Sequence, residues 1–491
     1  MGDPASFETV SSGVDGLDTL LNGGFVGSRM YLVLGAPGTG KTTLGMEFLV
    51  EGLDNDERVL FVHGEESREN LLTNAAAFGL DLSEADFLDV GPESEFFKRS
   101  QTYDIAQPVD VDEFSMIADM REAIERLDPD RILIDPITQL QYIEPTEYQF
   151  RRRIIAFMRF LKGRGTTVVA TKTASDQMED QLMSLSDGVI SLETGVEGGR
   201  ISVPKHRGVG QQDGTHGMEI REAGIDVYPA LVPGDHSRTF DPEPLSSGEP
   251  NLDKLLAGGL EEGTVTILSG PSGVGKSTTA TAFLASVAAD GGDALAYLFE
   301  ESLALFSYRA ESFGIPIESL RESGRLTIDT IEPLKQSPEE FGRLVRTQVE
   351  ARDPTLVVID GIEGYRTAIK GDEEAIDLRR KLHALTRFLT NMNVSVILID
   401  ERSEVMGLPR PTSANLSYLA DNIVFQNFFE HKGELRRAVG VLKKRVGPFE
   451  TRLREFEIGG DGLSVGEPIQ DMQGVLEGSL QVDDASDHGA K

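Results

Sequence analysis

The chain has 491 residues, more than one hydrophobic core accommodates, and this length predicts two domains of about 230 residues plus a tail. Its formal net charge of −35, with 33 Arg against only 14 Lys, disfavours nonspecific nucleic-acid binding, which requires cations that neutralise phosphates. We interpret this charge as that of a halophilic protein, and the absence of Cys excludes disulfides, thiolate metal sites and a Cys nucleophile.

The amino terminus carries no targeting signal that we recognise. Met1-Gly2-Asp3-Pro4 lacks the basic and apolar regions of a secretion signal. The sequence also holds no run of about 18 apolar residues, so we predict no membrane-spanning helix and no membrane partner. We therefore expect a cytoplasmic protein.

The first motif in chain order is a phosphate-binding loop followed by Thr43. It reads Gly35-Ala36-Pro37-Gly38-Thr39-Gly40-Lys41-Thr42. Glycines let backbone N–H groups curl around phosphates, the Lys reaches the β- and γ-phosphates, and the Thr hydroxyl ligates Mg²⁺. Apolar residues 31–34 predict the strand that enters the loop, and residues 43–51 predict a helix whose N-terminus faces the anion. The motif predicts a nucleoside triphosphate site with Mg²⁺.

Carboxylates follow the next predicted strands. A strand at 59–62 precedes Glu65 and Glu66, and a strand at 131–134 ends at Asp135. Asp135 has the form expected of the aspartate on the Mg²⁺ side, with a helix cap as the alternative. At least one of the two glutamates is expected near the γ-phosphate, the alternative being two ordinary surface glutamates. A further strand is predicted at 167–170.

Lys205 and Arg207 follow a predicted strand at 200–203. Phosphoryl transfer needs cations that neutralise charge in the transition state, and a neighbouring subunit can supply them. In a chain short of lysine we interpret this Lys-x-Arg cluster as such a group. The alternative is an ordinary solvated turn.

Prolines at 229, 233, 242 and 244 predict an interdomain linker over residues 229–244, because proline cannot continue a helix or a central strand. We predict a first domain over 1–235, a second over 236–460, and an acidic tail over 461–491. The tail lacks apolar residues to bury, so we expect it to be mobile.

The second half repeats the first at a constant offset of 235 residues. Ser11-Ser12-Gly13 recurs as Ser246-Ser247-Gly248, and the Glu pair recurs as Glu300 and Glu301. The second phosphate loop, followed by Thr278, reads Gly270-Pro271-Ser272-Gly273-Val274-Gly275-Lys276-Ser277. The flanking predictions are a strand at 265–268, a helix at 278–289, and strands at 294–299, 356–359 and 394–399.

After an indel the offset becomes 228, and the repeat supplies the remaining parts of a second site. Asp360 ends a predicted strand as Asp135 does, so we place it with Ser277 on the Mg²⁺ side. Lys443 and Arg445 follow a strand at 438–442. The fold class predicted from this alternation is α/β, with two tandem phosphate-loop domains, each a mostly parallel sheet flanked by helices.

Taken together, these motifs resemble the KaiC family, the tandem-domain branch of the RecA/DnaB-type ATPases, over residues 6–460. The resemblance implies RecA-like domains, two stacked rings of six subunits, and ATP with Mg²⁺ held between neighbours. It implies that Glu65 and Glu66 activate water, and that Lys205 and Arg207 reach the adjoining subunit's γ-phosphate. In the second domain it implies serine/threonine autokinase activity, with Glu300 and Glu301 as the base.

The sequence departs from the family pattern at two places. Alignment through Asp421-Asn422-Ile423 puts Ser417 and Tyr418 where clock members carry adjacent phosphorylated Ser and Thr. Val446 stands where the family usually has Gly. We therefore expect slow ATP hydrolysis with at most partial phosphorylation at Ser417, rather than a two-site cycle.

Two alternative functions remain open. A DNA-dependent recombinase or helicase-type ATPase would need a basic, aromatic-bearing loop, which the sequence does not offer. A non-catalytic signalling scaffold would bind ATP only to assemble, and the two Glu pairs argue against it. Regulatory protein partners are expected but not identified by any motif.

Overall fold

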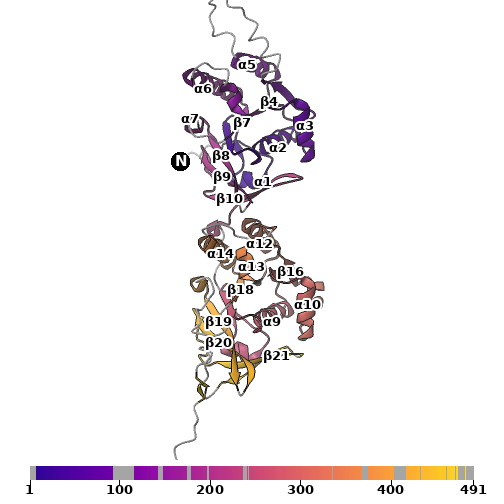
Figure 1. Cartoon of the computed structure of the whole chain (residues 1–491), viewed down its shortest axis with the longest axis vertical. Coiled ribbons are helices and arrows are strands. Elements are labelled where there is room, and N and C mark those ends of the chain that lie inside the picture. Colours follow the sequence, from indigo (N-terminus) through magenta and orange to yellow (C-terminus); the bar gives the residue numbers. More distant parts are fainter. Residues whose placement is uncertain are drawn as a thin grey trace, which may run out of the picture. The chain divides into compact units, whose positions relative to one another are not determined.

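The structure, a computed structural model, divides into two compact units, Met1–Ala230 and Leu231–Lys491, coloured indigo to magenta and pink to yellow in Figure 1. The division falls within the predicted linker. The residues that the structure describes are 7–91, 116–141, 147–173, 179–195, 198–235, 240, 243–333, 335–367, 374–402, 416–431, 433–460, 462–469, 472–473 and 481–482.

The first unit contains a nine-stranded sheet in the order β11-β10-β9-β8-β3-β7-β6-β4-β5. Strands β3 to β8 pair in parallel, and β9 to β11 return antiparallel along one edge. The strands are β3 (Met30–Gly35), β4 (Val59–His63), β5 (Asp86–Asp89), β6 (Arg131–Asp135), β7 (Thr167–Thr173), β8 (Gly188–Gly195), β9 (Gly198–His206), β10 (Thr215–Arg221) and β11 (Gly224–Tyr228). The helices are α1 (Asp15–Leu20), α2 (Lys41–Asp54), α3 (Arg68–Ala77), α5 (Met116–Leu127), α6 (Glu147–Arg164) and α7 (Glu179–Leu185).

The second unit repeats this topology strand for strand, in the order β16-β15-β17-β18-β14-β19-β20-β21-β22. Its strands are β14 (Val265–Gly270), β15 (Ala294–Leu298), β16 (Leu326–Thr330), β17 (Leu356–Asp360), β18 (Ser395–Glu401), β19 (Asn422–His431), β20 (Glu434–Lys444), β21 (Arg454–Gly459) and β22 (Gly462–Pro468). Its helices are α8 (Pro250–Leu255), α9 (Lys276–Ala289), α10 (Leu303–Ser312), α11 (Ile317–Glu322), α12 (Pro338–Arg352), α13 (Ile362–Thr367) and α14 (Glu374–Asn391). The predicted fold class, two mostly parallel sheets flanked by helices, is confirmed.

Short pieces complete the described chain. Each unit opens with a two-stranded ribbon, and a third follows β22. Residues 461, 470–471, 474–480 and 483–491 of the predicted tail lie outside the described residues. Ordered structure thus continues past residue 461, because β22 is the edge strand of the second sheet. The ribbons and short 3₁₀ helices are β1 (Thr9–Val10), β2 (Phe25–Val26), β12 (Pro244–Leu245), β13 (Leu260–Glu261), β23 (Met472–Gln473), β24 (Gln481–Val482), η1 (Ile137–Gln141), η2 (Pro233–Asp235) and η3 (Leu416–Tyr418).

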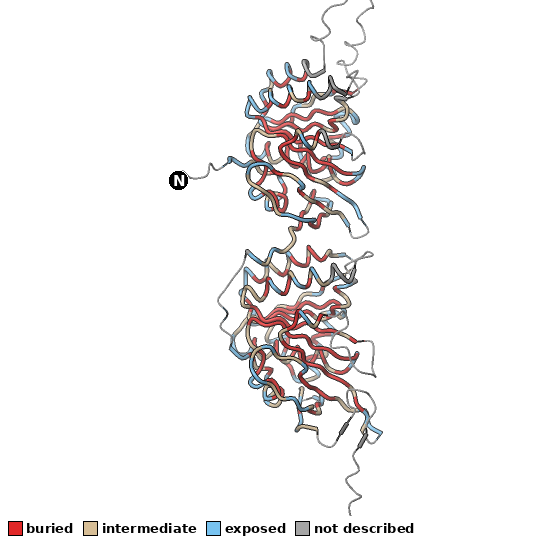
Figure 2. Tube along the Cα trace, turned by 90° about the vertical axis from the view of Figure 1, so that its left-hand side faces the viewer, coloured by how far each residue is buried: buried red, intermediate tan, exposed pale blue. Residues whose placement is uncertain are grey.

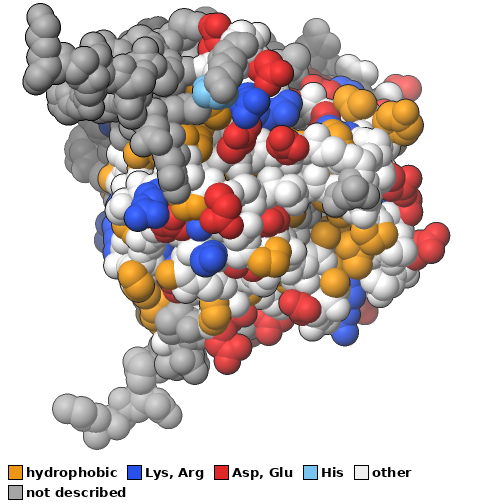
Figure 3. All heavy atoms as spheres, turned by 90° about the horizontal axis from the view of Figure 1, so that it is seen from below, with side chains coloured by type: hydrophobic (Ala, Val, Ile, Leu, Met, Phe, Trp, Pro, Cys, Tyr) orange, Lys and Arg blue, Asp and Glu red, His pale blue; other side chains and the backbone are white. Residues whose placement is uncertain are grey.

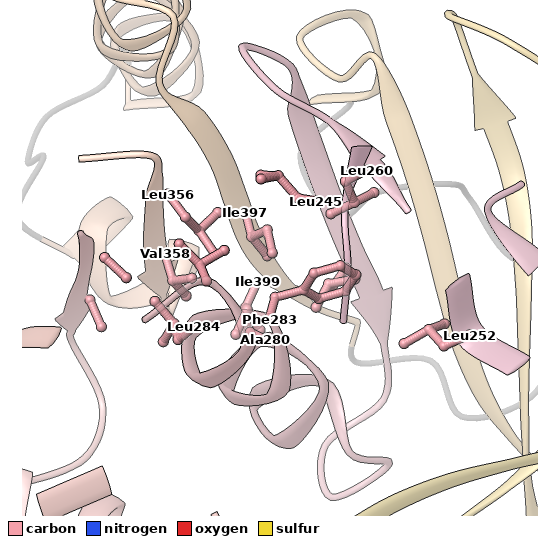
Figure 4. Close-up of a cluster of buried hydrophobic side chains, with 14 of the residues drawn as sticks. Leu245, Leu252, Leu260, Ala280, Phe283, Leu284, Leu356, Val358, Ile397 and Ile399 are labelled. Carbon is pink, nitrogen blue, oxygen red and sulfur yellow. The ribbon is translucent and has the colours of Figure 1, made fainter. Parts of the chain in front are cut away.

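Helices cover both faces of each sheet, and alternate residues of the central strands supply the two cores. In β3, Tyr31 and Val33 pack with α2 and α3, whereas Leu32 and Leu34 pack with α5 and α6. The buried residues, red in Figure 2, follow the strands of both sheets. Figure 4 shows the corresponding cluster of the second unit, where Ala280, Phe283 and Leu284 of α9 pack against the sheet that carries Val358 and Ile399. The predicted strands are therefore continuous apolar runs because both faces are buried.

The repeated Ser-Ser-Gly opening has a structural role in both units. Ser11 Oγ and the Ser12 backbone N–H both donate to the carboxylate of Asp18, each at 2.8 Å. Ser246 and Ser247 bind Asp253 in the same way, at 2.6 and 2.8 Å. These hydrogen bonds fix the turn that leads into α1 and α8. The motif repeats because both units need this turn, not because it contributes chemistry.

Helix α2 is attached to the edge strand β11 by a buried carboxyl group. Glu47, 6 % exposed, accepts a hydrogen bond of 2.7 Å from the backbone N–H of Ile225. Its second carboxylate oxygen has no hydrogen-bond partner among the described residues. Burial, with Asp226 adding to it, raises the pKa of Glu47 from 4.5 to about 7, although the hydrogen bond from Ile225 acts in the opposite direction.

We expect Glu47→Gln to stabilise the first unit above neutral pH. Because folding raises this pKa, the folded chain binds the proton more tightly, and stability falls as the pH rises from about 4.5 through about 7. The amide keeps the acceptor for Ile225 and carries no charge, so the free energy of unfolding at pH 8 should rise by roughly 2 kcal/mol. Urea unfolding at pH 5 and pH 8 measures the gain, which should be smaller at pH 5. Asp54→Asn, an exposed change on the same helix, is the control, and an equal gain at both pH values would contradict the prediction.

Candidate functional site

The phosphate loops occupy the carboxyl end of the central strand in each sheet. The first loop leaves β3 and enters α2, and neighbouring strands end beside it, with Gly35 opposite Thr173 and His63 opposite Asp135. Gly38 and Gly40 have φ values of 79° and 93°, which disfavour any residue with a Cβ. In the second loop the corresponding values are 73° and 123°. Both loops thus have the curled backbone that a phosphate cradle requires.

The loop lysines are buried and face their own loops. Lys41 Nζ donates to the carbonyl of Ala36, and Lys276 Nζ to the carbonyl of Pro271, each at 2.8 Å. Burial lowers the pKa of both ammonium groups, and nearby carboxylates oppose this effect: Asp135 and Glu65 in the first site, Glu401 foremost in the second. Each lysine amine therefore lies between the backbone of its phosphate loop and the neighbouring acidic side chains.

A hydroxyl and a carboxylate form the predicted metal side of each site. Thr42 Oγ1 donates to Asp135 at 2.7 Å, and Thr171 of β7 donates to the other carboxylate oxygen. Ser277 likewise hydrogen-bonds Asp360. The residue corresponding to Thr171 is Ile399, which offers no hydroxyl. Burial raises the pKa of Asp360 to about 6, with Ser277 and Arg309 lowering it and Glu301 and Glu300 raising it.

The Glu pairs stand in short loops between a strand and a helix. Ser67 and Ser302 cap α3 and α10 by accepting from Asn70 N and Leu305 N, which fixes the residues just before them. The first member of each pair lies near enough to the phosphate-loop lysine for its charge to raise the pKa of that lysine. The pKa of Glu300 is itself raised, mainly by burial and then by the charge of Glu401. The second member turns to the helix: Glu66 accepts from Asn74, and Glu301 pairs with Arg309.

Glu401 is a residue that sequence reasoning missed. It ends β18 opposite Gly270, and its carboxylate lies 3.8 Å from Lys276 Nζ. The corresponding residue in the first sheet is Thr173, opposite Gly35. The signal was present in the sequence, because the offset of 228 aligns Thr173 with Glu401. At this position the second site thus holds a negative charge beside its phosphate loop, whereas the first site has the neutral side chain of Thr173.

We expect Glu401→Thr to tighten Mg-ATP binding in the second domain. Removing the carboxylate ends its repulsion of the phosphates and its competition for Lys276, and an ion pair this exposed is worth roughly 1 kcal/mol, about fivefold in affinity. Titration of a fluorescent ATP analogue with the full chain, which contains both sites, measures the change in affinity.

The reciprocal Thr173→Glu should weaken the first site by a similar factor. Glu401→Gln keeps the shape of the side chain and should match Glu401→Thr if charge is the cause. Weaker binding in Glu401→Thr would contradict the prediction.

The Lys-x-Arg clusters lie at the opposite end of each sheet. Lys205 of β9 pairs with Val189 near the start of β8, and the start of β8 pairs with Tyr31 near the start of β3. At about 3.3 Å per residue, the six-residue strand β3 separates this end from the phosphate loop by roughly 15 Å or more. The prediction that Lys205 follows its strand is wrong, because β9 continues to His206; Lys443 likewise lies within β20.

In both units the lysine of the cluster donates to backbone carbonyls, whereas the arginines differ in their partners. Lys205 Nζ donates to the carbonyls of Met183 and Ser184 at 2.5 and 3.2 Å, and Arg207 donates to Ser184. Lys443 Nζ donates to the carbonyls of Ser417 and Ala420 at 3.0 and 2.6 Å. Arg445 pairs with Asp421 at 2.8 Å. Burial lowers the pKa of Lys205 and Lys443, with the neighbouring arginine adding to the effect.

Ser417 and Tyr418 belong to the 3₁₀ helix η3, at this same end of the second sheet. Ser417 is partly exposed, and half of Tyr418 is exposed. The Tyr418 ring stacks on His383 with centroids 6.3 Å apart. The two residues therefore lie beside Lys443 and away from their own phosphate loop.

Phosphate loops entered by the central strand of a parallel sheet, each with a hydroxyl–carboxylate pair beside it, define RecA-like P-loop domains, here in tandem. A sequence model of the KaiC ATPase family matches residues 10–232 and again 245–470. The chain therefore belongs to the KaiC family of ATPases.

Curated relatives match along nearly the whole chain, each being a circadian clock oscillator protein KaiC. The protein of Parathermosynechococcus lividus is 26% identical over 485 residues, covering 95% of this chain and 87% of the relative. That of Acaryochloris marina is 26% identical over 482 residues, covering 95% and 90%. That of Synechococcus elongatus is 24% identical over 493 residues, covering 96% and 92%.

Proposed function

We propose that this chain is a regulatory ATPase that binds Mg-ATP in both domains, hydrolyses it slowly, and assembles as a homohexamer with nucleotide at the subunit boundaries. The observation that carries the proposal is the grouping, twice over, of a cradling loop, a buried lysine, a hydroxyl–carboxylate pair and a glutamate at one end of a sheet. This is the set of groups that cleavage of a γ-phosphate requires.

The donor sets suit Mg²⁺. Thr42 with Asp135, and Ser277 with Asp360, would hold the ion, which supplies neutralisation of phosphate charge. Among the described residues no three acidic or imidazole side chains form a protein-only metal cage. Mg²⁺ at a phosphate loop needs none, because substrate oxygens and water complete its shell.

Within each site, the carboxylates would act on the attacking oxygen. The charge of Glu65 raises the pKa of Lys41, so Glu65 lies near the phosphate loop. We therefore assign Glu65, together with Glu66, to orient and deprotonate water in the first domain. Glu300 and Glu301 have the same assignment in the second. The lysines would neutralise charge on the β- and γ-phosphates.

The trans cations are assigned by their position. Lys205 and Arg207 lie at the end of the sheet remote from their own phosphate loop, so in a ring they would serve the loop of the adjoining subunit. Lys443 and Arg445 have the same assignment in the second ring. This placement supports a head-to-tail assembly.

The surface does not favour a nucleic-acid partner. On the face shown in Figure 3, acidic side chains lie beside the Lys and Arg side chains of the described residues, which form no broad basic surface there. In the part of the chain that the structure describes, every helix is too short or too polar to cross a bilayer. We propose that the protein acts in a salty cytoplasm, where dissolved ions screen its net charge of −35.

Steady ATP turnover in molar KCl, with and without single-stranded DNA, tests the proposal. We expect slow, Mg²⁺-dependent release of phosphate that DNA does not change. Stimulation by DNA would favour the recombinase or helicase alternative. Binding of ATP without release of phosphate would favour the scaffold.

Ser417 is the acceptor that we propose for limited phosphorylation. Its carbonyl binds Lys443, the amine assigned to a neighbour's phosphates, so its hydroxyl would lie close to that neighbour's nucleotide. Intact-mass measurement after incubation with Mg-ATP, followed by mapping of the added phosphate, tests this. We expect partial occupancy at Ser417; phosphate on Tyr418 alone, or none, would contradict it.

A further inference from the structure

The two copies hold the second glutamate of their pairs in different ways. In the first domain, Asn74 Nδ2 donates a single hydrogen bond of 2.9 Å to Glu66. In the second, Arg309 contacts both carboxylate oxygens of Glu301, from Nη2 at 2.5 Å and from Nε at 3.4 Å. Asn74 and Arg309 occupy the same place in the repeat, at the offset of 235. A neutral amide in one copy is thus replaced by a cation in the other.

Surrounding contacts hold the Arg309 guanidinium in place. It lies over the ring of Phe306, 5.2 Å from its centroid, and Phe306 is itself buried. A third nitrogen, Nη1, lies 3.4 Å from the hydroxyl of Thr278, the residue that follows the phosphate loop. The side chains of Arg309 and Glu301 are only 22 % and 18 % exposed. A two-pronged, stacked and partly enclosed pair is held more firmly than an exposed ion pair or a single amide contact.

This ion pair stands beside the chemistry of the second site. Both of its charges act on Asp360, the carboxylate assigned to the metal side. One prong of the guanidinium reaches the first turn of α9, the helix that starts at Lys276. Arg309 is therefore close enough to the reacting groups to control Glu301, and no similar cation contacts Glu66 among the contacts described for the first site.

We propose that Arg309 is a positioning residue that restrains Glu301 and so slows ATP hydrolysis in the second domain. In hydrolysis a carboxylate takes a proton from water, the water oxygen bonds to the γ-phosphorus, and the bond to the β–γ bridging oxygen breaks to leave ADP and phosphate. A carboxylate neutralised and fixed by a guanidinium is a poorer proton acceptor and cannot turn toward the water. In the described part of the first domain, the Glu66 carboxylate instead accepts from the neutral amide of Asn74. The inference rests on the proposed ATPase function.

The test replaces Arg309 by the residue that the first domain has. In a background of Glu65→Gln and Glu66→Gln, which silences the first site and keeps its phosphate loop, Arg309→Asn should raise kcat in the second site about three- to tenfold. The KM for Mg-ATP should change by less than about twofold. Arg309→Lys keeps the charge but loses the two-pronged contact, and should give a smaller rise. A gain in turnover is not what damage to folding produces.

The reciprocal change provides the second arm. In a background of Glu300→Gln and Glu301→Gln, Asn74→Arg should lower kcat in the first site by a similar factor. An unchanged kcat in Arg309→Asn, or a lower kcat with a higher KM, would overturn the proposal, the latter result making Arg309 a phosphate ligand. Absence of turnover from the wild-type chain would instead contradict the ATPase function itself, so the two failures are distinguishable.

Discussion

We expect Lys41→Ala to abolish most of the steady ATP turnover and Lys276→Ala to leave most of it intact. Loss of one positioned cation at the transferring phosphate lowers kcat by about 10²- to 10³-fold. The first site should carry the larger share of turnover, because the second has Glu301 held by Arg309 and Lys276 approached by Glu401. Phosphate release by each variant, at equal protein concentration in molar KCl, measures the ratio.

Lys254→Ala, an exposed change outside both sites, is the matched control for removing a lysine and should retain full turnover. Light scattering should accompany each assay, so that loss of assembly is separated from loss of chemistry. Equal turnover in Lys41→Ala and the wild type would contradict the prediction. So would a loss confined to Lys276→Ala.

Mixing two inactive variants should restore activity if Lys205 and Arg207 act on a neighbour. Arg207→Ala lacks the trans cation and should lose about 10³-fold or more in kcat, whereas Lys41→Ala lacks the cis cation. At a boundary where Arg207→Ala supplies the phosphate loop and Lys41→Ala supplies the cations, every group is present. Equal mixing before addition of Mg-ATP should therefore recover about a quarter of wild-type turnover, the fraction of boundaries with that pairing.

The double variant with Lys41→Ala and Arg207→Ala in one chain, mixed with wild type, is the control, because it supplies no additional complete boundary beyond those between wild-type subunits. A mixture no more active than its two components would contradict action across the boundary. Activity retained by Arg207→Ala alone would also contradict it.

The fold was largely predictable because its strands are buried on both faces. Runs such as 31–34 and 356–359 are apolar throughout. The first leads into a phosphate loop and the second ends at Asp360, so strand and function were recognised together. Strands β10, β11 and β21, at or next to an edge of their sheet, carry mixed polar sequences and gave no such signal.

The site was predictable in its parts but not in its arrangement. That Lys205 lies far from Lys41 depends on the antiparallel return of β9, which no local spacing reveals. Arg309 was visible as a change from Asn74, yet its meaning required the distance to Glu301. The roles of Thr171 and Glu47 likewise depended on contacts with strands distant in the sequence, β6 for Thr171 and β11 for Glu47.

The two sheets with identical strand order belong to one polypeptide, which fixes the molar ratio of the two domains. Because one polypeptide contains both copies, synthesis delivers them in strict one-to-one stoichiometry, whatever the expression level. Any inequality in ADP content between the two domains would then report a difference in reaction rates or affinities, and never a difference in abundance.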